Sequence, residues 1–387
     1  MRESILHRPD KLFTPGPVNI PNRVALASVS ACYHHRVKAF SDILGETLDL
    51  LKPVFGTTRQ VYPVHTTGRG AMEGVINNIL TPNDKAIAVC NGSFGAMAAK
   101  MMDRNGIPNV RYCEDWSDNV DLEYLENLIQ SEKATAITVV HNDTSNGLVN
   151  PIWDIGRLAR KYDLMLIVDF VSAAACAPFQ FDEWGVDAVV TASQKGLMSP
   201  AGMSFCVLSE KAERACAAID SHDFYIDFKS IRKNLEKNGQ TPGSTPVSLV
   251  LAVHEAVKMI DEEGLENVFA RHHDLACRTR AALQALGFRL FPENCNYRSD
   301  SLTVATPPDG VDIARLAAYM QKEYHLQIGK GLGDYANKTI RIAHMGCCYI
   351  EDMIQCIAAL EGAMVALGWR KTAGEGLQAF LAGGAQQ

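Results

Sequence analysis

Two residues whose types favour covalent and acid–base chemistry each follow an apolar run in the middle of the chain. Asp169 ends the run "LMLIVD" at residues 164–169, and Lys195 follows "DAVVTASQ" at residues 187–194. A buried carboxylate needs a cationic partner, or it takes up a proton. A lysine in a desolvated pocket can lose its proton and form a Schiff base with an aldehyde. The alternatives are a structural ion pair for Asp169 and a solvated surface position for Lys195.

The segments around these residues predict a sheet that would bring both to one edge. Short apolar runs alternate with amphipathic, helix-like stretches from about residue 60 to residue 210. The runs are "DKAIAVC", "ATAITVVH", "LMLIVDF", "DAVVTAS" and "GMSFCVLS". Such alternation is typical of an α/β fold with a mostly parallel sheet covered by helices on both faces. In sheets of this kind, ligands bind at the carboxyl ends of the strands.

A glycine-rich turn at residues 65–71, "HTTGRGA", leads directly into a predicted helix. Backbone N–H groups at the start of a helix bind phosphate, and Gly68 and Gly70 allow the main chain to approach a ligand closely. The alternative is an ordinary strand-to-helix turn. The spacing is close to that of the dinucleotide fingerprint, but the third position is Glu73 instead of glycine, so we do not expect NAD binding.

Two further strand ends carry side chains suited to a flat, polar ligand. Phe94 lies between glycines in "NGSFGA", where an aromatic ring either stacks on a ligand or fills the core. The run "HNDTSNG" at residues 141–147 gathers polar groups, although turn formation alone also favours these residue types. An aldehyde cofactor with a pyridine ring and a phosphate would use the lysine, the aspartate, the aromatic ring and the glycine turn together.

The composition indicates a globular chain that does not bind nucleic acid. It has 387 residues, of which 47% are apolar, and its formal net charge is -7 with acidic and basic residues mixed throughout. Because the N-terminus lacks a signal-peptide pattern and no apolar run has the length of a membrane span, we expect a cytoplasmic protein without membrane contact. The 11 cysteines form no CxxC pair, so we expect reduced core residues and no metal site or disulfide framework.

The pattern also predicts how the chain is divided. Long helical periodicity at about residues 247–287 leads out of the α/β region, and shorter strands and helices follow. We therefore expect an N-terminal arm at residues 1–20, a large α/β domain at 21–262, a smaller C-terminal α+β domain at 263–372 and a tail at 373–387.

The order and spacing of many short motifs resemble those of the class V, fold-type I pyridoxal phosphate enzymes, and within them the alanine–glyoxylate and serine–pyruvate aminotransferase group. The similarity extends over nearly the whole chain. Its pieces include "TPGPVNIP", "HHRVKAF", "TTGRGAMEGVINNIL", "NGSFG", "HNDTSNGLVNPI", "LIVDFVSA", "ASQKGLMSPAGMSF", "TPGSTPVSL", "GKGLG" and "IRIAHMG". The resemblance implies the fold-type I transferase fold and pyridoxal 5'-phosphate as cofactor.

The resemblance also implies roles for residues of this chain. Lys195 would hold the cofactor as a Schiff base and move protons during catalysis, and Asp169 would pair with the protonated ring nitrogen. Phe94 would stack on the ring, Thr144 would bond to its hydroxyl group, and Arg341 would bind the substrate carboxylate. Further cofactor contacts are implied for Gly68, Arg69, Gly70, Val171, Gln194, Thr241 and Ser244. Thr241 and Ser244 would reach the site of the neighbouring subunit, which implies a homodimer with shared active sites.

The implied reaction is a ping-pong transamination from a small amino acid or amine to a small 2-oxo acid, glyoxylate or pyruvate. Departures from the usual motifs leave the amino donor open: Asp143 replaces glutamate, Asn146 replaces threonine, and Arg69 replaces a smaller residue or histidine. The alternatives are a lyase of the same fold, such as a cysteine desulfurase-like enzyme, and a pyridoxamine–pyruvate or aminophosphonate-type transaminase.

Overall fold

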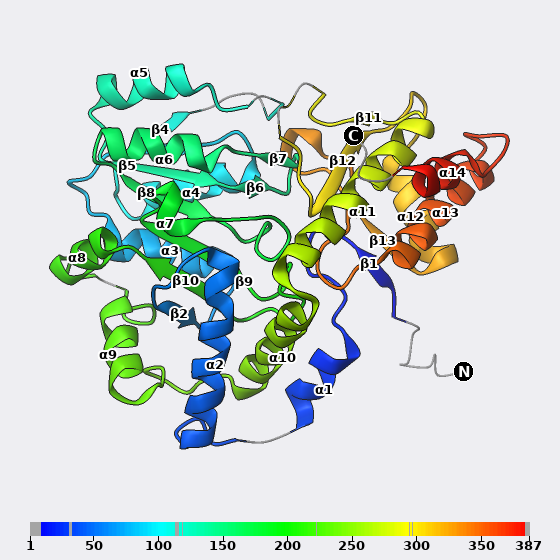
Figure 1. Ribbon diagram of the computed structural model, residues 1–387. Coiled ribbons are helices and arrows are strands. Elements are labelled where there is room, and N and C mark those ends of the chain that lie inside the picture. Colours follow the sequence, from blue (N-terminus) through cyan, green and yellow to red (C-terminus); the bar gives the residue numbers. More distant parts are fainter. Residues whose placement is uncertain are drawn as a thin grey trace, which may run out of the picture.

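A seven-stranded sheet forms the centre of the protein (Figure 1). The computed structural model describes residues 9–30, 33–112, 116–117, 119–221, 223–293, 295 and 297–383. The strands follow in the order β2 (Val61–Val64), β10 (Ser204–Leu208), β9 (Ala188–Ala192), β8 (Met165–Asp169), β5 (Ala136–Val140), β3 (Ala86–Val89) and β4 (Asn109–Tyr112). Only β10 runs against its two neighbours, β2 and β9, so the sheet is mostly parallel as the sequence predicted.

Alternation along the central strands divides the core of this sheet into two layers. In β8, Leu166 and Val168 contribute to one layer, whereas Met165 and Ile167 contribute to the other. This is the two-residue period of a strand that is buried on both faces. Helices α2 (Lys38–Phe55), α5 (Leu122–Glu132), α6 (Ile152–Lys161), α7 (Phe181–Trp184) and α10 (Val247–Glu263) cover the first layer. Helices α3 (Gly68–Ile79), α4 (Ser93–Arg104), α8 (Glu210–Ala218) and α9 (Phe228–Asn238) cover the second layer.

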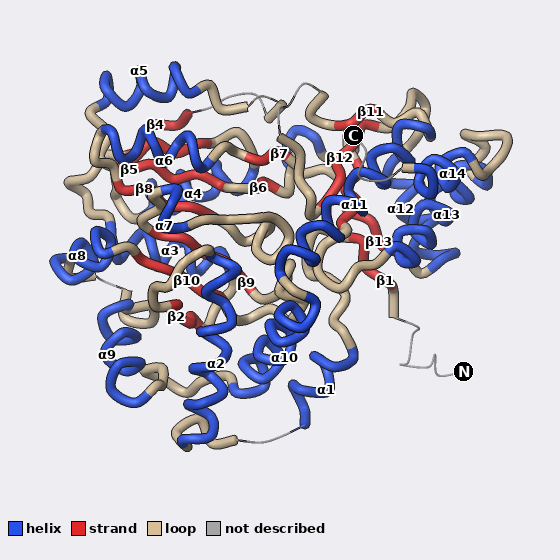
Figure 2. Tube along the Cα trace, viewed as in Figure 1, coloured by secondary structure: helices blue, strands red, loops and turns tan. Residues whose placement is uncertain are grey.

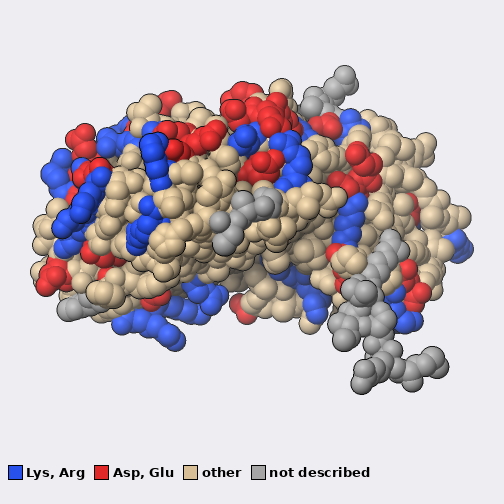
Figure 3. Space-filling view, turned by 90° about the horizontal axis from the view of Figure 1, so that it is seen from below, with Lys and Arg blue, Asp and Glu red and all other residues tan. Residues whose placement is uncertain are grey.

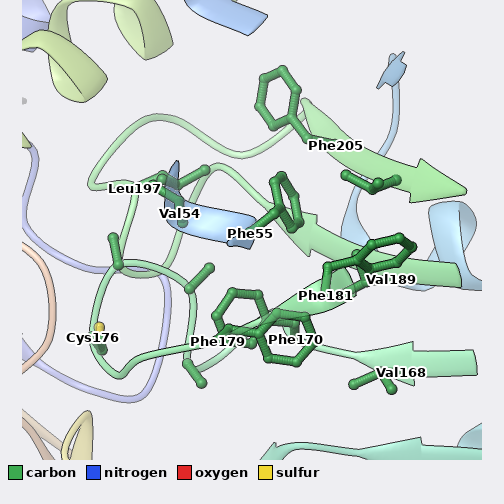
Figure 4. Close-up of a cluster of buried hydrophobic side chains, with 14 of the residues drawn as sticks. Val54, Phe55, Val168, Phe170, Cys176, Phe179, Phe181, Val189, Leu197 and Phe205 are labelled. Carbon is green, nitrogen blue, oxygen red and sulfur yellow. The ribbon is translucent and has the colours of Figure 1, made fainter. Parts of the chain in front are cut away.

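Aromatic side chains fill the first layer near the ends of β8 and β9 (Figure 4). Phe170 stacks on Phe179 with ring centroids 4.3 Å apart, and Phe55 of α2 lies 6.3 Å from Phe170. All three rings are buried. The segment that follows Asp169 is therefore anchored by aromatic packing, which contributes both buried area and fixed ring geometry.

A second, smaller sheet lies beside the first and contains both early and late parts of the chain (Figures 1 and 2). Its order is β1 (Lys11–Phe13), β13 (Leu326–Lys330), β14 (Ile340–Ala343), β12 (Leu302–Thr306) and β11 (Arg289–Leu290). Strand β1 pairs in parallel with β13, and Phe13 is buried in the core of this unit. Helices α11 (Leu265–Ala285), α12 (Ile313–Tyr324), α13 (Ile350–Ala366) and α14 (Glu375–Ala382) pack around the sheet.

Short elements connect these two units. A two-stranded hairpin, β6 (Asn142–Asp143) and β7 (Leu148–Val149), follows β5, and a 3-10 turn, η1 (Gly333–Tyr335), follows β13. Helix α1 (Asn22–Ser30) packs on α10. Gly264 joins α10 to α11 with a φ of 84°, a backbone conformation that favours glycine. We propose that the large domain, residues 21–262, and the small domain, residues 263–372, divide next to this glycine.

The surface and the cysteines agree with a globular protein. Lysine and arginine are interspersed with aspartate and glutamate over the face drawn in Figure 3. No helix among the residues described here has both the length and the apolar content needed to cross a bilayer. Of the nine cysteines in the described part of the chain, six are buried. Cys32 and Cys113 lie outside the described residues.

Close approach of α6 to α7 gives a testable prediction about stability. A methyl group at Gly156 would collide with the backbone oxygen of Trp184, whereas a methyl group at Gly45 in the interior of α2 would meet nothing within 4 Å. We expect Gly156→Ala to destabilise the protein by about 1–3 kcal/mol through overpacking. Gly45→Ala should instead stabilise it by about 0.5–1 kcal/mol, because alanine loses less backbone entropy in a helix. Urea unfolding midpoints measure both; equal midpoints would contradict the packing argument.

Candidate active site

Asp169 and Lys195 lie at the same edge of the large sheet because their strands are parallel neighbours. Asp169 is the last residue of β8 and is aligned with Val190 of β9, and Lys195 follows shortly after β9 ends. The turn that holds Lys195 is closed by a 2.8 Å hydrogen bond from the N–H of Met198 to the Lys195 carbonyl. The structure thus brings together the two residues that the sequence assigned to catalysis.

Burial pushes both groups towards their neutral forms, and their opposite charges resist this. Desolvation raises the pKa of Asp169 to about 6, although the Val171 N–H donates a 2.9 Å hydrogen bond to its Oδ1 and favours the charged form. Desolvation lowers the pKa of Lys195 to about 8, while the charge of Asp169 raises it. Between these two values both groups are charged, so around neutral pH the pair is ionic.

A segment near the N-terminus covers Lys195. The Nζ of Lys195 donates a hydrogen bond to the carbonyl of Pro15, which is far from Lys195 in the sequence. The next residue, Gly16, has a φ of 115°, and a methyl group there would lie 2.5 Å from Cδ and Cε of Lys195. Pro15 and Gly16 were not among the site residues predicted from the sequence. The signal was the "TPGP" motif, in which glycine between two prolines indicates a tight, close-packed turn.

The glycine turn lies against the strand ends that carry the acid and the lysine. Gly68 begins α3, and a methyl group there would lie 2.7 Å from a methyl carbon of Val171 and 3.4 Å from Cβ of Ala192. Within the described residues, no side chain caps this helix start: Thr67 occupies the N-cap position without a side-chain hydrogen bond. The first N–H groups of α3, including those of Arg69 and Gly70, are therefore available as donors for an anion.

Two buried polar atoms, on the segments that follow β2 and β9, have no hydrogen-bond partner among the described residues. The Oε1 of Gln194 and the Nε2 of His65 are both inaccessible to solvent and have no hydrogen-bond partner among the described residues. Burial also lowers the pKa of His65 to about 4, so this imidazole is neutral at physiological pH. Buried polar groups without a partner are uncommon. Together with the open helix start, they fit a phosphorylated pyridine ring placed between Asp169 and Lys195.

A buried carboxylate, Asp143, fixes the loop that carries the aromatic ring. Its Oδ2 accepts a 2.9 Å hydrogen bond from the N–H of Phe94, and its Oδ1 accepts hydrogen bonds of 2.9 Å and 2.6 Å from the N–H and hydroxyl of Ser145. Phe94 is only partly buried and, with Arg69, lines a cavity of about 720 Å³. Asp143 belongs to the polar run at residues 141–147, which begins where the buried strand β5 ends, but its hydrogen bond to the Phe94 loop was not predicted from the sequence.

Arg341 extends from β14 of the small sheet to the edge of the large one. Its Nη1 donates a 2.9 Å hydrogen bond to the carbonyl of Thr144, and its Nε donates one of 2.8 Å to the carbonyl of Lys330. No carboxylate pairs with this guanidinium among the described residues. Burial lowers its pKa to about 10, so it stays charged at neutral pH. Thr144 is buried beside it.

Thr241 and Ser244 lie in a different environment from the other predicted site residues. The hydroxyl group of Thr241 pairs with that of Thr245 at 2.7 Å, and its carbonyl accepts a 2.8 Å hydrogen bond from Arg36. Ser244 is exposed. Within the described chain, no hydrogen bond joins either residue to Lys195 or Asp169, which leaves the expected contact with a neighbouring subunit as a proposal.

The lowered pKa of Lys195 predicts how its reaction with an aldehyde depends on pH. Only the neutral amine attacks, so below pH 8 the rate at which cofactor-free protein binds pyridoxal phosphate should fall about tenfold per pH unit. Asp169→Asn should move the midpoint to lower pH, because it removes a charge that raises the lysine pKa. Stopped-flow absorbance measures both rates. A midpoint near 10.5, the ordinary lysine value, would contradict this account.

Comparison with known proteins agrees with this geometry. The family Aminotransferase class-V matches residues 23–341. An L-aspartate–glyoxylate aminotransferase from Paracoccus denitrificans is 35% identical over 375 residues, which cover 95% of this chain and 94% of that protein. The crystal structure of a ureidoglycine–glyoxylate aminotransferase from Bacillus subtilis has a TM-score of 0.92 at 27% identity, covering 98% of this chain and 99% of that one. A pyridoxamine–pyruvate aminotransferase from Mesorhizobium loti has a TM-score of 0.89 at 25% identity, covering 99% and 98%. This chain belongs to the class V aminotransferases.

Proposed function

We propose that this enzyme uses pyridoxal phosphate to move an amino group from a small amino acid or amine to glyoxylate or pyruvate by a ping-pong mechanism. The proposal depends on three charged side chains that lie close together at one edge of the large sheet. Asp169 and Arg341 are both close enough to Lys195 for their charges to shift its pKa. The relatives named above act on glyoxylate or pyruvate, which supports the choice of acceptor.

The described residues offer a matching contact for each part of the cofactor. The start of α3 at Gly68, Arg69 and Gly70 would hold the phosphate together with the side-chain amide nitrogen of Gln194, which follows β9. Phe94 would stack on one face of the ring, and Val171, which lies against Gly68, would contact the cofactor as well. The described residues carry no cluster of histidine, cysteine or acidic groups that could hold a metal ion.

When bound, the cofactor supplies an electron-withdrawing ring that stabilises the negative charge left when a carbon of the substrate loses its proton. Asp169, ionised above about pH 6, holds the proton on the ring nitrogen. Lys195, whose pKa is about 8, is suited to accept that carbon's proton and to return it at the neighbouring position, since catalysis is efficient when the pKa lies near the working pH. Arg341 holds the substrate carboxylate and so fixes which bond faces the lysine.

The structure gives a physical reason to prefer transamination over the desulfurase-like alternative. The cysteine whose pKa responds to the charge of Lys195 is Cys176, which is 1% exposed and packs against Gly196. Burial raises the pKa of this thiol to about 12. A cysteine nucleophile needs a thiolate that can reach the substrate, and Cys176 offers neither the charge nor the mobility.

A homodimer is part of the proposal. The loop that carries Thr241 and Ser244 is held by Arg36, which donates hydrogen bonds to the carbonyls of Thr241, Pro242 and Gly243. Such a rigid, partly exposed loop is suited to project into a second subunit, where its hydroxyl groups would complete the phosphate site. The cytoplasmic location stays a prediction from the sequence.

The role of Lys195 is tested by its removal. We expect Lys195→Ala to abolish transamination and the yellow colour of the cofactor-loaded enzyme, because it removes the amine that would form the Schiff base with the cofactor. Lys237→Ala, at an exposed position in α9, is the matched control and should keep both properties. Steady-state assays with glyoxylate and visible absorbance are the measurements. Turnover and colour that persist in Lys195→Ala would reject the assignment.

The role of Arg341 can be tested with two kinds of amino donor. Arg341→Gln should raise the KM for L-alanine, L-serine or L-aspartate about tenfold or more, since a charged hydrogen bond to a carboxylate contributes about 1.5–3 kcal/mol. Pyridoxamine has no carboxylate, so its half-reaction should change little in the same variant. Single-turnover absorbance measurements compare the donors, and the same panel identifies the preferred one. An equal loss with pyridoxamine and with amino acids would contradict the proposed role.

A further inference from the structure

We propose that Cys277 is a reactive thiol that forms mixed disulfides with small disulfides carrying a carboxylate, in a cavity separate from the site at Lys195. The cavity has a volume of about 1020 Å³ and contains none of the residues to which the preceding analysis gave a catalytic or cofactor-binding role. It lies where the small unit meets the large one: His273, Cys277 and Arg280 line it from α11, and Trp153 and Trp184 line it from α6 and α7.

Cys277 lies within a chain of polar side-chain contacts. Its Sγ is 3.6 Å from Nε2 of His273, one helical turn earlier on α11. The other ring nitrogen of His273, Nδ1, is 3.2 Å from each carboxylate oxygen of Asp300. Nη2 of Arg280 donates a hydrogen bond of 3.3 Å to the same sulfur and lies 3.7 Å from Oδ1 of Asp300. A thiol with a histidine to accept its proton, an aspartate to orient that histidine and a guanidinium beside the sulfur is arranged for nucleophilic attack.

The other two partly buried thiols in the described part of the chain lack this arrangement. Cys295 lines the same cavity, but the hydrogen bond that its Sγ makes among the described residues is to the carbonyl of Pro292, at 3.7 Å, and burial raises its pKa. Burial likewise raises the pKa of Cys347, the third cysteine that is not fully buried. These two residues are internal controls for the reactivity of Cys277.

The lining of the cavity indicates the chemistry of the occupant. Two guanidinium groups, Arg280 and Arg298, and one carboxylate, Asp300, face it, so the balance favours an anion. Trp153 packs edge-on against Trp184 and Tyr297, at centroid distances of 5.6 Å and 5.2 Å, and these rings form an apolar wall.

A buried histidine in the same cavity lacks a hydrogen-bond partner. His141 is 2% exposed, and its Nδ1 has no partner among the described residues. Burial lowers its pKa to about 4, so the imidazole is neutral at physiological pH. Its Nδ1 can then form a hydrogen bond with a bound group without carrying a charge. An occupant with an apolar body and a carboxylate fits these contacts.

The reaction is a thiol–disulfide exchange. The Cys277 sulfur, after its proton passes to His273, attacks one sulfur of the small disulfide; a new S–S bond forms as the old one breaks. The departing sulfur leaves as a thiolate and takes up the proton from His273. No external oxidant is required, because the small disulfide is itself reduced to one free thiol and one protein-bound half.

The test uses the cofactor-loaded enzyme and 5,5'-dithiobis(2-nitrobenzoic acid), a disulfide with two aromatic carboxylates. We expect Cys277 to react first, as read from thionitrobenzoate release and from peptide mass spectrometry. His273→Gln should slow Cys277 about tenfold or more, as loss of a neighbouring base does for activated thiols, and leave Cys295 and Cys347 unchanged. Asp300→Asn should slow it in the same direction, which guards against a folding defect in one variant.

A neutral disulfide separates the role of the cavity from that of the thiol. Arg280→Gln should slow the reaction of Cys277 less with neutral 2,2'-dithiodipyridine than with the dicarboxylate reagent. The reason is that only the dicarboxylate loses a contact with a cationic side chain in this variant. Cys277→Ser should remove the fastest phase of thiol release, which we assign to Cys277, with both reagents. If another cysteine reacts first, if His273→Gln and Asp300→Asn leave the Cys277 rate unchanged, or if Arg280→Gln slows both reagents equally, the proposal is overturned.

Discussion

The attraction between Asp169 and Lys195 in a buried setting is the constraint on which the site depends. Burial shifts both groups towards their neutral forms and their opposite charges resist this, so the pKa of the acid is about 6 and that of the amine is about 8. The gap between the two values keeps both charged near neutral pH and yet leaves the lysine close to releasing its proton. An acid–base group in this state suits repeated proton transfer better than a fully solvated lysine would.

The fold maintains this pair through contacts from distant parts of the chain. Parallel pairing of β8 and β9 places the two residues at one edge, and aromatic packing at Phe170 fixes the segment between them. Gly16 and Gly68 let the backbone approach Lys195 and Val171 more closely than any larger residue would. Arg341 comes from the small sheet, so the proposed substrate site needs both units.

Much of this architecture could be predicted from the sequence, because it depends on local pattern. The apolar runs at β5, β8 and β9, the glycine turn before α3 and the position of Asp169 after a strand all follow from periodicity and turn chemistry. Contacts between distant segments could not be predicted in this way. Strand β1 pairs with β13, and the Pro15 carbonyl meets Lys195, only because the folded chain brings them together. The reversed direction of β10 and the hydrogen bond from Phe94 to Asp143 are of the same kind.

The central claim is that Lys195 and Asp169 hold opposite ends of one bound ring. The most direct measurement is a crystal structure of the enzyme after loading with pyridoxal phosphate and reduction with borohydride, which makes the bond to the lysine permanent. We predict continuous electron density from Nζ of Lys195 to the ligand, with the ring nitrogen within hydrogen-bond distance of the Asp169 carboxylate. Density on a different lysine, or a ring nitrogen directed away from Asp169, would contradict the account.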